Sequence, residues 1–195
     1  MKNWKLLFVI CLVWLLGFGV DGAEAAGKRA IMVVAAYGFQ DNEYLIPRQV
    51  LEQGGVEIKV ASSSLDEAVG MMGARVQPDF LVSEVNPQEF DAVIFVGGEG
   101  SSEYFKDEDA LELVKEAKKQ KKILAAICIA PQIFAQAGIL RGIKATSAPT
   151  SRPALRRVRA RYTGRPVEVS GRIITASGPQ DSEDFGRAIL QALSE

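Results

Sequence analysis

The chain has 195 residues, of which 48% are hydrophobic and 24% charged, a composition typical of one globular domain and not of a disordered chain. Lys and Arg number 23 against 24 Asp and Glu, so the overall charge favours neither nucleic acid nor an anionic membrane as a partner. Two cysteines and no histidine exclude a Ser-His-Asp triad, a Cys-His pair and a His-ligated zinc site within this chain, and we expect no metal site.

The first 25 residues have the pattern of a secretory signal peptide. Lys2 and Lys5 form a basic start, residues 6–20 are an apolar run, and Ala23-Glu24-Ala25 supplies the small residues of a cleavage site. An uncleaved membrane anchor is the alternative, but the run is short for a span of about 20 residues. We therefore expect cleavage after Ala25.

Cleavage would leave residues 26–195 as one exported domain, periplasmic or secreted, without stable membrane association. Cys11 would leave with the peptide, so Cys128 would be the single cysteine and could not form an internal disulfide. An unpaired thiol in an exported protein indicates an intermolecular bond, a buried inert group or a reactive group.

The mature chain opens with an apolar run over 30–36, which predicts a strand buried on both faces of a parallel sheet. A helix is expected over 41–53, with Asp41 or Asn42 as its cap. Pro47 falls inside this helix and indicates a kink or a late start.

Four further elements are predicted before residue 107. They are a strand over 56–61, a small hairpin or excursion within 67–85, a helical turn over 86–90 and a buried strand over 92–96. A helix is then expected over 107–120.

The second half repeats the alternation of strand and helix. Its predicted elements are a buried strand over 123–127, a helix over 131–138, a short strand over 144–147, a hairpin over 167–175 and a helix over 181–193. This order predicts an α/β sandwich around a mostly parallel sheet in a single domain.

Cys128 is the sharpest candidate for chemistry, because it follows a strand and precedes a tight turn into a helix, the order of a nucleophile elbow. The helix N-terminus can lower the pKa of such a thiol. The amides of Ile129 and of the Gly97-Gly98 turn are candidate oxyanion donors. The alternative is that Cys128 is a small buried apolar residue, and local composition leaves both interpretations open.

Glu43 is the second candidate. A glutamate in the first turn of a helix is electrostatically favourable and needs no further role. Held beside Cys128, however, Glu43 could share a proton with the sulfur, provided that burial keeps its carboxyl group protonated.

Six arginines lie between Arg152 and Arg165. They indicate either an anion-binding patch or a solvated loop with a subunit-contact surface, and the balanced overall charge favours the second interpretation.

Several segments resemble motifs of the DJ-1/PfpI superfamily. Ala-Ala-Ile-Cys-Ile-Ala-Pro-Gln over 125–132 is similar to its A-x-I-C-H-G-P-Q elbow, and Asp91–Gly98 is similar to its strand ending in Gly-Gly. The segments 38–47, 138–142 and 174–179 resemble further family motifs, in the same order along the chain.

The resemblance implies a flavodoxin-like three-layer sandwich related to class I glutamine amidotransferase domains, forming a homodimer or higher homo-oligomer. It also implies that Cys128 is the elbow nucleophile, that Glu43 hydrogen-bonds to it, and that no cofactor is needed. A small electrophile or a peptide is the expected ligand, and no nucleic acid.

The sequence departs from the peptidase branch of this family. Ile129 stands where PfpI-type peptidases have histidine, and Ser102, with Glu103 beside it, stands where a neighbouring subunit supplies their acid. The segment 146–149 lacks a histidine that some members have there.

Three functions follow from the resemblance and these departures. The first is oxidative or carbonyl stress response through the Glu43–Cys128 pair, by thiol oxidation or by glyoxalase or deglycase-type chemistry. The alternatives are a PfpI-type cysteine peptidase or amidase, and a non-catalytic binding or chaperone-like protein.

Overall fold

The computed structural model describes residue 25 and residues 27–195. The predicted signal peptide, residues 1–25, therefore lies outside the described residues apart from Ala25. Within the described part, no helix is both long and apolar enough to cross a membrane.

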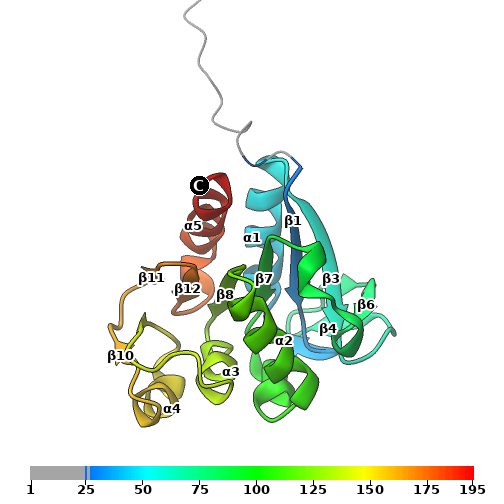
Figure 1. Ribbon diagram of the computed structural model, residues 1–195. Helices are drawn as coiled ribbons and strands as arrows, with labels where there is room; N and C mark the ends of the chain where they lie inside the picture. Colours follow the sequence, from blue (N-terminus) through cyan, green and yellow to red (C-terminus); the bar gives the residue numbers. More distant parts are fainter. Residues whose placement is uncertain (1–24, 26) are drawn as a thin grey trace, which may run out of the picture.

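A seven-stranded sheet forms the centre of the molecule, in the order β11-β12-β8-β7-β1-β3-β6 (Figure 1). All neighbouring strands run parallel except β11 and β12. The strands are β1 (Arg29–Val33), β3 (Glu57–Ser62), β6 (Phe80–Leu81), β7 (Ala92–Phe95), β8 (Ile123–Ile127), β11 (Val167–Ser170) and β12 (Ile173–Ala176).

Helices cover both faces of this sheet, which makes three layers. The helices are α1 (Asp41–Gln53), α2 (Glu108–Lys119), α3 (Pro131–Gln136), α4 (Arg152–Arg157) and α5 (Ser182–Ser194). Helices α1 and α5 pack against each other on one face, and α2 and α3 lie on the other. The predicted α/β sandwich with a mostly parallel sheet is confirmed.

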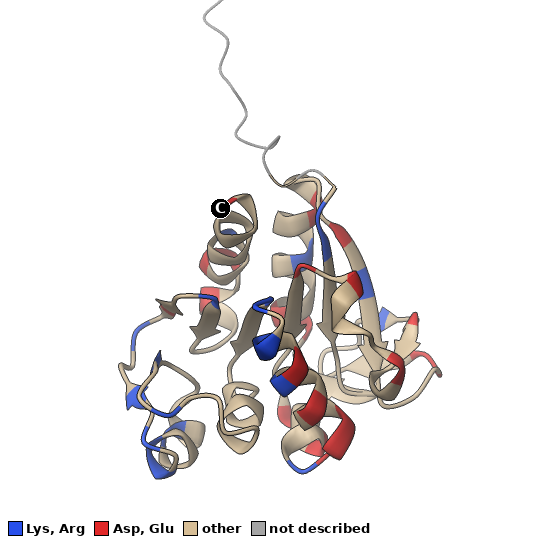
Figure 2. Ribbon diagram, in the orientation of Figure 1, with Lys and Arg blue, Asp and Glu red and all other residues tan. Residues whose placement is uncertain are grey.

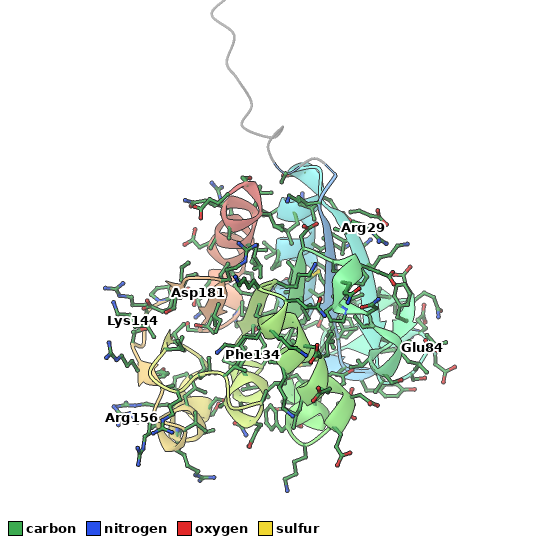
Figure 3. The ribbon with its side chains drawn as sticks, viewed as in Figure 1. Arg29, Glu84, Phe134, Lys144, Arg156 and Asp181 are labelled. Carbon is green, nitrogen blue, oxygen red and sulfur yellow. The ribbon has the colours of Figure 1, made fainter. Side chains whose placement is uncertain are left out.

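The core explains why the predicted strands are uniformly apolar. Alternate residues of one strand face opposite layers, so Ile31 packs with the α2 side while Met32 packs with the α1 and α5 side. Phe134 of α3, labelled in Figure 3, is fully buried in the first of these layers.

Two small sheets flank the main one. The first joins β2 (Tyr37–Phe39), β4 (Ala68–Gly70) and β5 (Arg75–Val76), and the second pairs β9 (Lys144–Ala145) with β10 (Arg161–Tyr162). The antiparallel β4–β5 pair is the hairpin expected within 67–85. Five short 3-10 helices complete the described chain: η1 (Val82–Glu84), η2 (Pro87–Glu89), η3 (Glu99–Phe105), η4 (Pro149–Ser151) and η5 (Pro179–Asp181).

The predicted N-cap residue of α1 is wrong. Gln40, not Asp41 or Asn42, is the N-cap, and its side chain accepts a hydrogen bond from the Glu43 amide at 2.9 Å. The Asp41 carboxylate instead accepts hydrogen bonds from the backbone amides of Met72 and Ala74. The helix also begins at Asp41 with Pro47 inside it, so the late start is wrong.

The basic segment is more ordered than a solvated loop. Arg152–Arg157 forms helix α4, whose Leu155 is fully buried, and Arg161–Tyr162 pairs with β9. Sequence patterning missed α4 because only one turn of it carries a buried apolar side chain.

Candidate functional site

Cys128 lies at the carboxyl end of β8, between the strand and helix α3. Its backbone is in the left-handed region, with φ of 62°, which is uncommon for a residue other than glycine. Two backbone hydrogen bonds hold it there, from the Cys128 amide to the Ala176 carbonyl at 3.0 Å and from the Ala148 amide to the Cys128 carbonyl at 2.7 Å. Pro131 begins α3 immediately afterwards. The thiol is free and half-buried.

Glu43 approaches this thiol from the first turn of α1 and is fully buried. The Gln40 cap orients that turn, and the Gln40 amide donates to the Gly97 carbonyl at 2.9 Å, which joins the helix start to the end of β7. Neither Glu43 carboxyl oxygen meets a well-aligned hydrogen-bond partner among the described residues. The carboxyl group is therefore buried near the thiol, with the Cys128 side chain and the Gly97 amide as polar neighbours.

Gly97 and Gly98 allow Glu43 and Cys128 to approach each other. A Cβ on Gly97 would collide with the Glu43 carboxyl group and lie 2.6 Å from the Cβ of Cys128. Gly98 has a φ of 98°, and a Cβ there would collide with the Gln40 amide. Both positions therefore need glycine for this packing.

Burial dominates the electrostatics of the pair. Removal from water raises the pKa of Glu43 to about 7, although the nearby Cys128 thiol and Gly97 amide partly oppose the shift. Burial, followed by the Glu43 charge, raises the pKa of Cys128 to about 11. The expected lowering of the thiol pKa by the helix is thus overridden, because burial disfavours the thiolate and the Glu43 charge adds to this effect.

The three amides predicted as oxyanion donors contact two different side chains, Cys128 and Glu43. The amides of Gly98 and Ile129 act on the sulfur, where they lower the pKa of Cys128 somewhat, whereas the Gly97 amide acts on the Glu43 carboxyl group. Two amides therefore lie next to the sulfur, the atom to which a substrate would bind.

The positions that differ from the peptidase pattern have other partners. The Ser102 hydroxyl donates to the Glu99 carbonyl at 2.8 Å, and the Glu103 carboxylate accepts from the Ser63 hydroxyl at 2.9 Å. Ile129 is half-buried beside the thiol. Without a histidine in the chain, no imidazole can take the Cys128 proton.

Gln40 is the residue of the site that sequence reasoning missed. Glutamine is an unusual N-cap, so capping preferences point to Asp41 instead. The spacing of three residues from Gln40 to Glu43 is the signal that could have found it, because a cap side chain accepts from the N3 amide.

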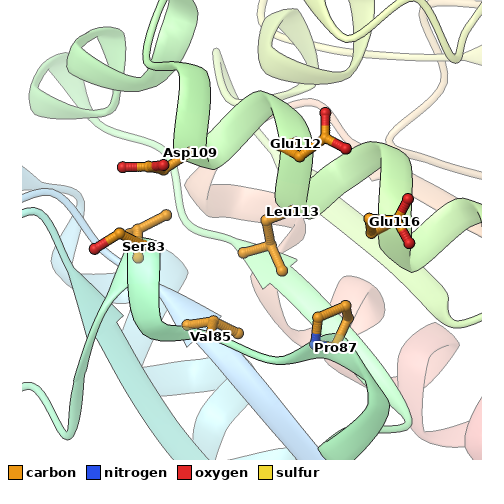
Figure 4. A pocket seen from close by; sticks show the side chains of 8 residues that line it. Ser83, Val85, Pro87, Asp109, Glu112, Leu113 and Glu116 are labelled. Atoms are coloured by element: carbon orange, nitrogen blue, oxygen red, sulfur yellow. The ribbon is translucent and has the colours of Figure 1, made fainter.

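The hollow in Figure 4 lies elsewhere. It has a volume of about 160 Å³ between η1 and α2, with Ser83, Asp109, Glu112 and Glu116 at its rim. It contains no residue of the Cys128 site. Among the described residues, no three Cys, Asp or Glu side chains gather closely enough to hold a metal ion.

Known proteins match most of the chain in sequence and in fold. The model of the DJ-1/PfpI family matches residues 28–192. A deglycase of Thermococcus kodakarensis is 31% identical over 163 residues, covering 84% of this chain and 98% of the relative. An uncharacterized protein of Methanocaldococcus jannaschii is 38% identical over 170 residues, covering 86% of this chain and 83% of the relative. The crystal structure of a ThiJ/PfpI domain protein from Brachyspira murdochii superimposes with a TM-score of 0.83 at 36% identity, covering 86% of this chain and 98% of the other.

Proposed function

The chain belongs to the DJ-1/PfpI family, and from this we propose that it removes reactive carbonyl compounds through Cys128 and Glu43. The observation that carries the proposal is the fully buried Glu43 carboxyl group beside the half-buried thiol, with its pKa raised to about 7. A carboxyl group with that pKa can both take and return a proton near neutral pH. The deglycase name of the Thermococcus relative supports the same class of substrate.

The proposed step is addition of the thiol to an aldehyde of the glyoxal type. The Cys128 proton passes to Glu43, a bond forms between the sulfur and the carbonyl carbon, and the carbon–oxygen π bond breaks. The oxygen takes the electron pair and then the proton from Glu43, which gives a hemithioacetal and restores the carboxylate. The amides of Gly98 and Ile129 stabilise the oxygen charge during this step.

Methylglyoxal consumption by the purified protein tests the proposal. Cys128→Ala removes the nucleophile and should abolish consumption, and Glu43→Gln should lower it by at least about a hundredfold, the usual contribution of a positioned acid and base. Glu168→Gln is the matched control, since Glu168 is also a buried glutamate but lies on the edge strand β11. It should consume methylglyoxal at the wild-type rate.

Two outcomes would reject this proposal in favour of the alternatives. Cys128-dependent cleavage of peptides or amides, with no methylglyoxal consumption, would assign the peptidase or amidase function. No turnover of either substrate by the wild-type protein would assign a non-catalytic role.

Thiol oxidation is a second candidate, favoured by the exposure of the half-buried sulfur and by the two amides that act on it. Hydrogen peroxide would supply the oxidising equivalents, with the sulfur gaining oxygen and the peroxide being reduced to water. Intact mass under graded peroxide should show two added oxygen atoms that are absent from Cys128→Ala. A mass unchanged at peroxide levels that oxidise exposed methionines would exclude this role.

Export is part of the proposal and is supported by the basic start, the apolar run and the small residues of positions 1–25, whereas the role in stress response rests on the proposed removal of carbonyl compounds. The mature protein recovered from the periplasm or the medium should begin at residue 26. A chain retained with residues 1–25 intact would contradict cleavage.

A further inference from the structure

The basic segment Arg152–Arg165 belongs to a longer stretch that contains no acidic residue. Between Lys118 and Val167 the chain has twelve Lys and Arg and no Asp or Glu. In Figure 2 the blue segments gather on α4 and its neighbouring strand, whereas red segments mark the first part of α2. Although the whole chain is nearly neutral, this side of the molecule is therefore strongly cationic.

Several arginines on this side, among them Arg141, Arg157 and Arg159, have no carboxylate partner within the described residues. Arg75, for comparison, pairs with Glu67 at 2.6 Å. The guanidinium groups of Arg141, Arg157 and Arg159 have neither a carboxylate within 4.0 Å nor a hydrogen-bond acceptor in the described part of the chain. All of their donors are available to a ligand.

The same three arginines line one hollow of about 320 Å³, together with Val158. The hollow lies between the loop that precedes β9 and the end of α4. Lys144 and Arg156, labelled at the left edge of Figure 3, project outward from the same region. Like charges gathered around one hollow repel each other, and a bound anion would relieve that repulsion.

The backbone at Arg159 supports a role for its side chain. Arg159 has a φ of 62° at the turn after α4, a conformation that normally favours glycine. Its amide donates to the Arg156 carbonyl at 2.9 Å, and its carbonyl accepts from the Gly142 amide at 3.0 Å. Glycine would adopt this turn with less strain, so the backbone itself does not require an arginine at this position.

We propose that Arg141, Arg157 and Arg159 form a binding site for a phosphate group, carried by a small molecule or by a lipid headgroup. Guanidinium groups suit this ligand because their planar donors form paired hydrogen bonds to oxyanions. The site shares no residue with the Glu43–Cys128 pair. A test of phosphate binding is therefore independent of the proposed carbonyl chemistry.

Calorimetric titration of the full chain with inorganic pyrophosphate tests the site. Arg157→Ala and Arg159→Gly should each weaken binding by roughly tenfold or more. Arg159→Gly is the sharper variant, because glycine keeps the left-handed backbone and should leave the unfolding temperature unchanged or higher. Arg75→Ala is the control, as an exposed arginine elsewhere, and should bind pyrophosphate like the wild type.

Sedimentation with phosphatidylglycerol–phosphatidylcholine vesicles separates the two sources of the phosphate. Pyrophosphate binding without vesicle binding would assign a free phosphorylated molecule, and vesicle binding lost in Arg157→Ala and Arg159→Gly would assign a headgroup. Absence of both, or binding unaffected by the two variants, would overturn the site. A change of oligomeric mass in these variants without any anion binding would overturn it in favour of a subunit contact.

Discussion

Glu43 and Cys128 titrate as one unit because each group alters the pKa of the other. Burial raises the pKa of Glu43 to about 7, and burial with the Glu43 charge raises that of Cys128 to about 11. Between these values the pair holds a single proton. The higher pKa of Cys128 places this proton mainly on the sulfur, and its transfer to Glu43 gives a thiolate beside the amides of Gly98 and Ile129. The reactive state therefore depends on the carboxyl group as much as on the thiol.

Alkylation of Cys128 with iodoacetamide should therefore follow the titration of the pair. In the wild type the rate should rise as the pH approaches about 11, because burial and the Glu43 charge keep the thiol protonated below that value. Glu43→Gln removes this charge, so its rate should rise at a lower pH, still above the ordinary thiol value of 9.0 because burial remains. A variant whose rate rises at the same pH as that of the wild type would show that the two side chains do not interact.

Stability should depend on pH through the same glutamate. Its pKa is raised on folding from 4.5 to about 7, so the folded state holds the proton more tightly than the unfolded chain. This contribution is fully present below pH 4.5 and is lost as the pH rises through about 7, with a limit of about 3 kcal/mol.

Urea unfolding at about pH 4 and about pH 8 measures this effect, because Glu43→Gln removes the titrating group while keeping its shape. The free energy of unfolding of the wild type, relative to Glu43→Gln, should fall as the pH rises across this range. An equal difference at both values would show that Glu43 ionises freely in the folded protein.

At the scale of elements, Asp41 joins helix α1 to the β4–β5 hairpin. Its buried carboxylate accepts from the Met72 amide at 2.8 Å and from the Ala74 amide at 2.6 Å. Gly70 makes room for it, since a Cβ there would lie 2.7 Å from a carboxyl oxygen of Asp41. The hairpin is thereby held against the start of the helix that carries Glu43.

Asp41→Ala should lower the free energy of unfolding by about 3 kcal/mol, since two charge-assisted hydrogen bonds are lost and two amides are left unpaired. Hydrogen exchange at Met72 and Ala74 should accelerate at the same time. Asp66→Ala, at an exposed position near the same hairpin, is the control and should change stability little. A loss below about 1 kcal/mol for Asp41→Ala would show that the hairpin docks without this carboxylate.

The elements themselves could largely be predicted from the sequence. The buried strand over 123–127 agrees residue by residue with β8, because an apolar run between turn signals has few alternatives. The cap of α1 and the whole of α4 could not be predicted in this way. Gln40 caps through a contact that propensities rank low, and α4 depends on the burial of Leu155 against the rest of the fold.

At the scale of the whole molecule, an exposed apolar patch lies beside the site. Tyr37, Met71 and Met72 are 70%, 52% and 71% exposed, on or next to the paired strands β2 and β4. Clustered exposed apolar side chains mark interaction surfaces. We propose that a second copy of the chain covers this patch, in line with the homo-oligomer expected from the family resemblance.

Sedimentation velocity tests this assembly. The double variant Tyr37→Ser, Met72→Ser should shift the protein to a smaller species, because the contact loses its apolar anchors. Val169→Ser is the matched control, as an exposed apolar residue on β11, and should keep the wild-type mass. A monomeric wild type, or a double variant that keeps the wild-type mass, would contradict the patch as the interface.

The sequence alone determined the sandwich and the position of Cys128 at a strand end, because these follow from local periodicity and turn residues, and it indicated the family through the resemblance of its segments to family motifs. The tertiary structure decided what that cysteine faces. Glu43 lies 85 positions away along the chain and meets the thiol only because β1, β7 and β8 are neighbours in the sheet and Gly97 leaves room between the two side chains. The raised pKa values follow from burial, which is a property of the packed molecule and not of either residue's neighbours in sequence.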